Sequence, residues 1–255
     1  MPATYVHYRF GKQLIPTLPA DVRQCIQRFR RFFDTGLQGP DLFFYYNPFG
    51  KTAIGNLGNT FHQQTGQEFF SHACAQADSE AADAYLYGLL AHYCLDSVCH
   101  PFINRMVNIG EASHIALEAE LERVFMAKDG ISQPHTYQRS KYVHLTRGEC
   151  MTAAKFFPPA TGSNISRCVR FYGMCLNFLG RTNREQTENL IRRFAPSHLE
   201  HLIPTEENED YLYLVRELQE LYEKAFNLYP VLLAQLQQHR ATGEALGEAF
   251  VPDFG

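Results

Sequence analysis

The feature that most constrains the fold of this chain is the spacing of its apolar residues. They recur with the 3.6-residue period of an amphipathic helix, and the strict alternation that is typical of a strand is nearly absent. Turn-forming residues separate these periodic segments, and Ser79 and Thr205 are the expected N-caps of two of them. We therefore predict an all-α protein with helices over residues 20–34, 60–77, 79–100, 111–128, 165–180, 184–195, 206–228 and 230–241.

The length of the chain fits one multi-helix domain, because 255 residues are enough to bury a sizeable core. The best candidate for an internal boundary is the segment Phe157–Asn164, where Pro158 and Pro159 prevent a helix from continuing. We predict a single domain over residues 1–255, in which residues 165–255 form an additional helical layer.

The composition excludes some classes of partner. A formal net charge of -4 gives no reason to expect a nucleic-acid surface. The first residues, MPATYVHYRFGKQ, lack the basic and apolar regions of a secretory signal, and no segment approaches the ~18 apolar residues of a membrane span. We expect a soluble, cytoplasmic protein with at most peripheral membrane contact. The seven cysteines form no C-x-x-C pair, which indicates reduced thiols in a core.

A polar stripe interrupts one of the most apolar helical segments, HYCLDSVCH. His92, Asp96 and His100 follow one another at four-residue intervals, so in a helix they lie on one face about 6 Å apart along the axis. Because Pro101 disfavours helical geometry at the preceding residue, we expect His100 at the helix end. This stripe alone fits a metal site and a buried polar network equally well.

The next predicted helix favours the metal site. In ASHIALEAELERVF, His114 and Glu118 are spaced so that both side chains can share one cation. Three further metal-type ligands precede the stripe, at His7, Asp41 and His62. Imidazole nitrogens and carboxylate oxygens without cysteines are typical of a catalytic zinc site, whereas structural zinc sites tend to be closed by thiolates.

The ordered set of an early His, the motif GPD, an isolated His, HxxxDxxxHP and HxxxE resembles the zinc-dependent phospholipase C family, which belongs to a superfamily with single-strand nucleases. The resemblance covers residues 1 to about 125, and it makes residues 1–128 a metal-binding core. It implies an all-helical fold with two or three zinc ions. The implied ligands are Asp41, His62, His92 and Asp96 for one ion, His100, His114 and Glu118 for a second, and His7, Asp96 and the chain terminus for a third.

Two departures from the family pattern concern the third ion and the spacing along the helix. Secreted relatives expose a tryptophan whose amine and carbonyl help to hold that ion, whereas this chain begins Met1, Pro2. Removal of Met1 would place Pro2 at about the right separation from His7. The relatives also have a longer gap after the bridging aspartate than the three residues between Asp96 and His100.

The resemblance implies hydrolysis of a phospholipid to diacylglycerol and a phosphorylated head group by a zinc-activated hydroxide. Asp41 would act as a ligand or as the base that orients the attacking water. The alternatives are a nuclease, a nucleotidase or a small-molecule phosphodiesterase on the same scaffold, and a noncatalytic helical protein stabilised by zinc. Glu118 and the acidic charge balance favour the phospholipase.

Two stretches, one aromatic and one basic, are candidates for contact with the substrate or with lipid. FFYYNPF follows Asp41, and its Phe44, Tyr45 and Tyr46 are candidate substrate-binding residues, although we expect most rings of this stretch in the core. The segment VRQCIQRFRRFF resembles a basic amphipathic helix that touches lipid. We favour a helix packed on the core with a solvated arginine face.

Overall fold

The computed structural model describes residues 4–47, 50–133, 137–179 and 209–255. Within these ranges the regular elements are helices, and the only ladder-like pairing is an isolated bridge between Thr65 and Asp253. The all-α prediction is therefore confirmed. The α-helices are α1 (Thr4–Leu14), α2 (Ala20–Arg28), α3 (Arg30–Gly36), α4 (Ala53–His62), α5 (Gly66–Gln76), α6 (Glu80–Asn108), α7 (His114–Lys128), α8 (Glu149–Ala154), α9 (Gly162–Leu179) and α11 (Leu212–Thr242).

Short 3₁₀-helices connect several of these elements. The one that matters most for the site is η2 (Gly39–Tyr45), which contains the GPD motif and begins three residues after α3 ends. The others are η1 (Ile15–Thr17), η4 (Arg139–Tyr142), η6 (Glu209–Tyr211) and η7 (Glu248–Phe250).

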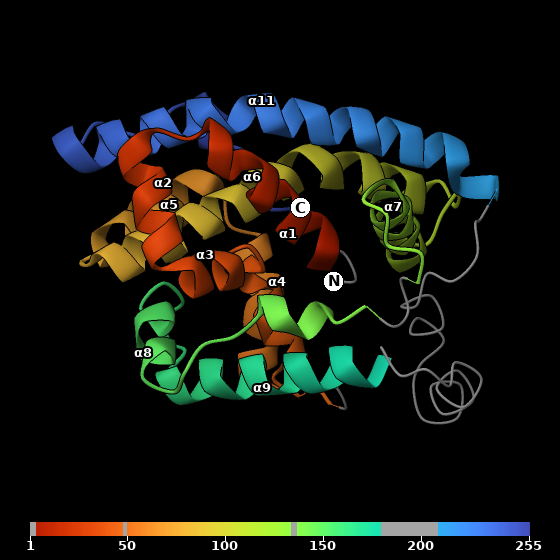
Figure 1. The fold of residues 1–255 in the computed structure, drawn as a ribbon. Coiled ribbons are helices and arrows are strands. Elements are labelled where there is room, and N and C mark those ends of the chain that lie inside the picture. Colours follow the sequence, from red (N-terminus) through yellow and green to blue (C-terminus); the bar gives the residue numbers. More distant parts are fainter. Residues whose placement is uncertain (1–3, 48–49, 134–136, 180–208) are drawn as a thin grey trace.

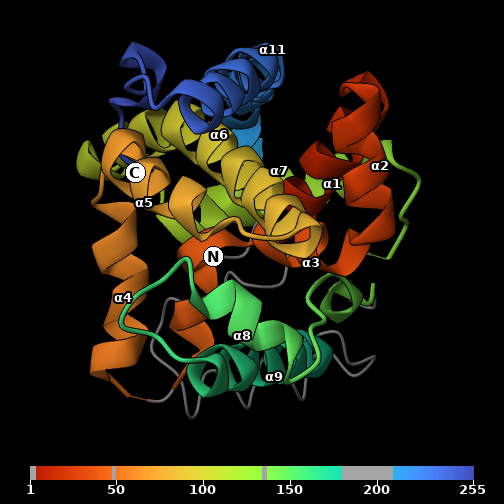
Figure 2. The same cartoon turned by 90° about the vertical axis from the view of Figure 1, so that its left-hand side faces the viewer.

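The long helix α6 is the central element of the fold. Between Ala82 and Ile103 it is buried over most of its circumference, as expected of a helix whose sequence is apolar on nearly every face. Both α3 and α11 pack against it. Figures 1 and 2 show α11 and α9 at opposite edges of the molecule, with α6 between them.

Two glycines allow α3 and α6 to approach each other closely. A Cβ added at Gly36 would lie 2.5 Å from the carbonyl oxygen of Tyr85, and one at Gly88 would lie 2.4 Å from that of Phe33. Any larger residue at either position would force the two backbones apart. This close crossing brings η2, the next element after α3, alongside α6.

Two of the predicted helices are each divided in the structure. The predicted helix 20–34 breaks at Phe29, whose φ of -116° and ψ of 41° interrupt the helical geometry between α2 and α3. The predicted helix 60–77 is replaced by the end of α4 and by α5, because Thr65 and Glu68 form a capping box that starts a new helix. Apolar periodicity continues across both breaks, so it did not predict them.

Two predicted helix ends at prolines are wrong. The helix α6 continues through Pro101 to Asn108, and α11 continues through Pro230 to Thr242. A proline inside a helix costs about 3 kcal/mol or more, but extensive burial on both sides of it offsets that cost here. His100 therefore lies inside α6 and not at its end.

Other expectations about the helices have mixed outcomes. The expected N-cap is confirmed at Ser79, whose hydroxyl accepts a hydrogen bond from the amide of Ala82. The helices α1 and α8 were not predicted. The expected helix over 184–195 and the expected cap at Thr205 lie outside the described residues.

The arginine-rich segment of α2 and α3 packs on the core. Val22 and Ile26 are buried, while Arg28 and Arg31 form ion pairs with Glu80 and Glu149. This arrangement agrees with a solvated arginine face. None of the helices in the described ranges is both long and apolar enough to cross a membrane.

Candidate metal centre

The candidate site is built around the polar stripe of α6. His92, Asp96 and His100 occupy successive turns of this helix, and all three side chains are buried. Histidines and a carboxylate from other helices lie beside this face, and Asp96 lies in the middle of the cluster.

The two carboxylate oxygens of Asp96 face different histidines. Its Oδ2 lies 3.0 Å from Nε2 of His92 and 3.8 Å from Nε2 of His62. Its Oδ1 lies 3.3 Å from Nε2 of His7 and 3.8 Å from Nε2 of His100. A carboxylate placed in this way can bridge two cations.

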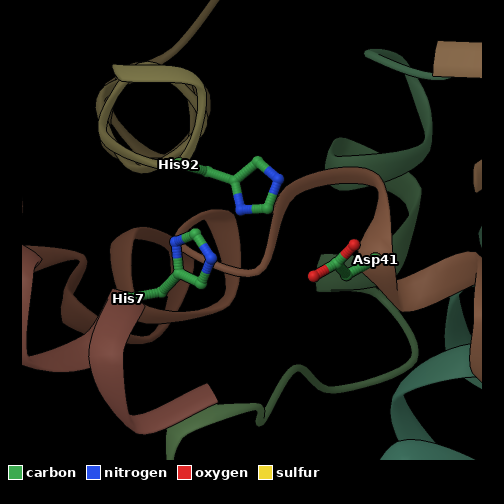
Figure 3. A group of neighbouring side chains, drawn as sticks. All are labelled: His7, Asp41 and His92. Atoms are coloured by element: carbon green, nitrogen blue, oxygen red, sulfur yellow. The ribbon is translucent and has the colours of Figure 1, made fainter. Parts of the chain in front are cut away.

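On one side of Asp96 lie His7, Asp41, His62 and His92, which we call the Asp41 group. They come from α1, η2, α4 and α6, and Figure 3 shows three of them directed toward a common space. The potential ligand atoms of His7, Asp41 and His92 lie within 4.8 Å of one another, as do those of His62, His92 and Asp96. Asp41 also lies 3.3 Å from Nε2 of His62.

On the other side lie His100, His114 and Glu118, which we call the Glu118 group. Their ligand atoms also lie within 4.8 Å of one another. Oε1 of Glu118 is 3.4 Å from Nε2 of His100 and accepts a hydrogen bond of 3.0 Å from Nε2 of His114. Because His114 and Glu118 are one turn apart on α7, the helix itself sets their spacing.

Backbone carbonyls fix the orientation of three of the histidines. Nδ1 of His62, His92 and His100 lies 2.7, 3.2 and 2.9 Å from the carbonyl oxygens of Gly58, Leu37 and Phe254, respectively. A carbonyl only accepts hydrogen bonds, so each Nδ1 carries a proton and donates it. The Nε2 atoms are then the metal-binding atoms, which is the usual arrangement around a metal ion.

The glycine of the GPD motif permits the close approach of η2 to His92. Gly39 has a φ of 49°, and a Cβ added there would lie 2.2 Å from Cδ2 of the His92 ring. Both the backbone conformation and the lack of space require glycine. The motif therefore places Asp41 and supports His92 at the same time.

The charges of the cluster keep its carboxylates ionised. Burial raises the pKa of Asp96, but the charges of His100, His92 and His7 outweigh burial and hold that pKa well below its usual range. Burial also opposes ionisation of Glu118, yet His114 and His100 help to hold its pKa well below normal.

The histidines respond to the same carboxylates. Burial lowers the pKa of His100, but the charges of Asp96 and Glu118 outweigh it and raise the pKa to about 9. Asp41 likewise raises the pKa of His62 against the effect of burial. Burial lowers the pKa of His92, which lies deepest in the cluster.

These residues fit zinc better than they fit a self-contained polar network. Nε2 of His92 is buried without a hydrogen-bond partner, although it lies only 3.0 Å from a carboxylate oxygen of Asp96. In neutral His92, the form that burial favours, Nδ1 donates to Leu37 and both facing atoms are acceptors, so their contact is unfavourable unless a cation lies beside them. Five imidazoles and three carboxylates match the ligands that zinc takes in catalytic sites.

A comparison with known protein families agrees with this donor set. The family model described as zinc dependent phospholipase C matches residues 6–156. The chain belongs to the zinc-dependent phospholipase C family. Neither the curated proteins nor the solved structures contain a match to the chain. The part of the chain that matches the family model contains all eight residues of the cluster, which are His7, Asp41, His62, His92, Asp96, His100, His114 and Glu118.

The structure brings together all eight predicted ligands of this zinc-dependent phospholipase C domain. The resemblance implied that His7 would join Asp96 and the chain terminus at a third ion. In the structure, Nε2 of His7 lies 3.3 Å from Oδ1 of Asp96, as implied. His7 also belongs to the Asp41 group, and its ring stacks on that of His92 at a centroid distance of 4.5 Å. The first three residues of the chain lie outside the described residues.

The candidate substrate-binding rings lie in different environments. The ring of Phe44 is half-buried, and its centroid is 5.7 Å from that of His62. Tyr45 is buried in the core, 4.3 Å from the ring of Tyr172. Tyr46 is half-buried and contacts Arg167. Phe44 is therefore the member of this trio that lies beside the cluster.

Sequence reasoning missed the backbone carbonyls that accept hydrogen bonds from the histidine ligands. The carbonyls of Leu37, Gly58 and Phe254 belong to the backbone, so no side-chain pattern reveals them. Phe254 is also more than 150 residues away from His100 in the chain. The seven cysteines are all free, and none of those in the described residues joins the metal-type groups.

Proposed function

We propose that the protein is a zinc-dependent phosphodiester hydrolase that cleaves a phospholipid to diacylglycerol and a phosphorylated head group. The observation that supports this proposal most strongly is the clustering of five histidines and two carboxylates around Asp96, in a chain that belongs to the zinc-dependent phospholipase C family. A closed structural site needs four ligands, so eight exceed what a purely stabilising ion requires.

The ligands divide between the two groups. We assign the Asp41 group to one side of the cluster and the Glu118 group to the other, with Asp96 shared between them. This arrangement would hold two or three zinc ions. Zinc bound there supplies Lewis acidity and lowers the pKa of a bound water toward ~7, which suits hydrolysis of a phosphodiester at neutral pH.

The protein's own residues would prepare the site for this chemistry. Burial raises the pKa of Asp41, but His62 and His92 contribute to lowering it below its usual range, so this carboxylate is ionised at neutral pH. It is then ready to bind a cation or to accept a proton from water. His62, His92 and His100 keep their Nδ1 protons on backbone carbonyls and direct Nε2 into the cluster.

The substrate would approach from the side of the Glu118 group. The side chain of His114 is 36% exposed, whereas the other ligand side chains are exposed by 10% or less. A phosphoryl group would therefore reach this group through the exposed side of His114. The half-buried ring of Phe44 lies near His62 and would contact the apolar part of the substrate.

Hydrolysis assays on three substrates test this proposal. The zinc-loaded protein is incubated with phosphatidylcholine vesicles, a soluble phosphocholine ester and a single-stranded oligonucleotide. We expect cleavage of the choline compounds, and loss of that cleavage in His92→Ala. His144→Ala is the matched control, because His144 is exposed and lies outside the cluster.

Two outcomes would contradict the proposal. Cleavage of the oligonucleotide without cleavage of either choline compound would assign the site to a nuclease. No hydrolysis of any substrate by the zinc-loaded protein would indicate a noncatalytic role for the metal.

A further inference from the structure

Residues 250–255 pack against the face of α6 that carries the candidate ligands. Tyr93 is one residue from His92 on α6, and its hydroxyl donates to the carbonyl oxygens of Ala249 and Pro252. The amide of Gly66, at the start of α5, donates to the same Pro252 carbonyl at 2.9 Å. Hydrogen bonds from two helices therefore fix the path of this segment.

Phe254 connects the two halves of the candidate metal centre through its backbone. Its amide donates to the carbonyl oxygen of His62 at 3.1 Å, and its carbonyl oxygen accepts from Nδ1 of His100 at 2.9 Å. One residue thus contacts a member of the Asp41 group and a member of the Glu118 group.

The side chain of Phe254 closes the space behind these histidines. It is completely buried, and its ring centroid lies 6.1 Å from the rings of both His62 and His92. It also makes edge contacts with Phe69 and Tyr93 at 5.1 and 5.0 Å. Both partners of the hydrogen bond between His100 and Phe254 are buried, and a hydrogen bond is stronger in such a low-dielectric environment than in water.

The next residue leaves no free space beside His100. A Cβ added at Gly255 would lie 2.1 Å from Cβ of His100 and 2.4 Å from its Nδ1. The φ of Gly255 is 104°, a conformation that residues with a side chain rarely adopt. The backbone of the segment therefore lies directly against the imidazole.

We propose that residues 250–255 are a positioning element of the metal centre, and that Phe254 sets the tautomer and the orientation of His100. This inference rests on the proposed function only in taking the two groups as metal ligands. An acceptor on Nδ1 keeps the proton there, leaves Nε2 for the ion and increases the basicity of the ring. The segment lies outside residues 6–156, the part of the chain that matches the family model.

Zinc affinity measured by chelator competition tests the inference. In Gly255→Ala, the new methyl group must displace His100 or the segment, so we expect one ion of the cluster to bind about 10- to 100-fold more weakly. Phe254→Gly should weaken the same ion. Phe254→Leu keeps an apolar side chain and the carbonyl, and should restore the affinity. Val251→Ala is the matched control, because Val251 is exposed in the same segment.

A second measurement separates positioning from a general loss of stability. In long-range ¹H–¹⁵N spectra of the zinc-loaded protein, we expect a protected Nδ1 proton on His100 that is lost or shifted in Gly255→Ala. The signals of His144, which is exposed and lies outside the cluster, should stay unchanged. Equal weakening of every ion, or loss of helical circular dichroism in both Gly255→Ala and Phe254→Gly, would overturn the inference.

The same experiments distinguish failure of this inference from failure of the proposed function. Unchanged zinc affinity in folded Gly255→Ala and Phe254→Gly would refute the positioning role and leave the hydrolase proposal intact. Weakened binding in these variants, with no hydrolysis by the zinc-loaded wild type, would support the positioning role and refute the hydrolase.

Discussion

The Asp41 group and the Glu118 group contain the same kinds of side chain but differ in how they are enclosed. Four elements surround the Asp41 group, and the exposed fraction of its side chains is 10% or less. The Glu118 group comes from α6 and α7 alone, and the side chain of His114 is 36% exposed. Among the described residues, the Asp41 group is therefore the more enclosed of the two, and the difference lies in His114.

This difference suggests that the two groups bind metal ions with different affinities. Enclosed ligands lose little conformational freedom when they bind an ion, because packing already holds them in place. A half-exposed ligand gains order on binding and leaves one side open to solvent. We expect tight, slowly exchanging metal at the Asp41 group, and weaker, exchangeable metal that meets the substrate at the Glu118 group.

Asp96→Asn should have the largest effect, because it removes the charge that both groups share. The amide keeps the shape of the side chain but cannot bridge two cations. We expect kcat/KM for a phosphocholine ester to fall by at least about 1000-fold, more than the loss of a single oxyanion-hole donor costs. Zinc content per chain should also fall. Asp21→Asn, at an exposed carboxylate, is the control. Wild-type activity in Asp96→Asn would rule out a shared ion-binding role for this residue.

Alanine substitutions in the two groups should differ in severity. We expect His92→Ala to weaken zinc binding about 100-fold and His114→Ala about 10-fold, because the enclosed ligand is the better organised of the two. Chelator competition measures both affinities, and His144→Ala serves as the control for loss of an imidazole. Equal effects in the two variants would mean that enclosure does not set affinity here.

Gly39→Ala should displace ligands of the Asp41 group and leave the positions of the Glu118 group unchanged. The added methyl group overlaps the ring of His92, and such overpacking costs about 1 to 3 kcal/mol of unfolding free energy. Gly130→Ala is the matched control, because Gly130 also has a positive φ but has nothing within 4 Å of the added atom. Urea unfolding compares the two variants. Equal destabilisation would show that backbone strain alone, and not the contact with His92, requires glycine at position 39.

The pH dependence of zinc binding should show whether zinc binds to His100 in the Glu118 group. Asp96 and Glu118 raise the pKa of His100 to about 9 against the effect of burial, so His100 holds a second proton at pH 7 in the metal-free protein. Zinc must displace that proton. The affinity of this group should therefore rise about tenfold between pH 7 and pH 8 and level off above about 9. Calorimetry in two buffers of different ionisation enthalpy measures the released proton, and no release would contradict the assignment.

The parts of the site that are local in sequence were predictable. The four-residue spacing of His92, Asp96 and His100, and of His114 and Glu118, places each set on one helical face whatever the rest of the chain does. Apolar periodicity likewise predicted that the protein is all-α. These predictions depend only on the geometry of a single helix.

The parts that depend on tertiary contacts were not predictable from spacing. Pro101 was expected to end a helix, because the cost of a proline is local while the burial that offsets it comes from the whole fold. The place of His7 beside His92 depends on the packing of α1 against α6. Phe254 lies in a short segment without periodicity, so its contact with His100 became visible only in three dimensions.

Anomalous diffraction at the zinc absorption edge, from crystals of the zinc-loaded protein, tests the central claim most directly. We predict at least two peaks that flank the carboxylate of Asp96, one within ligand distance of Asp41, His62 and His92, and one within ligand distance of His100, His114 and Glu118. Absence of zinc at Asp96, with these side chains bonded only to one another, would contradict the account.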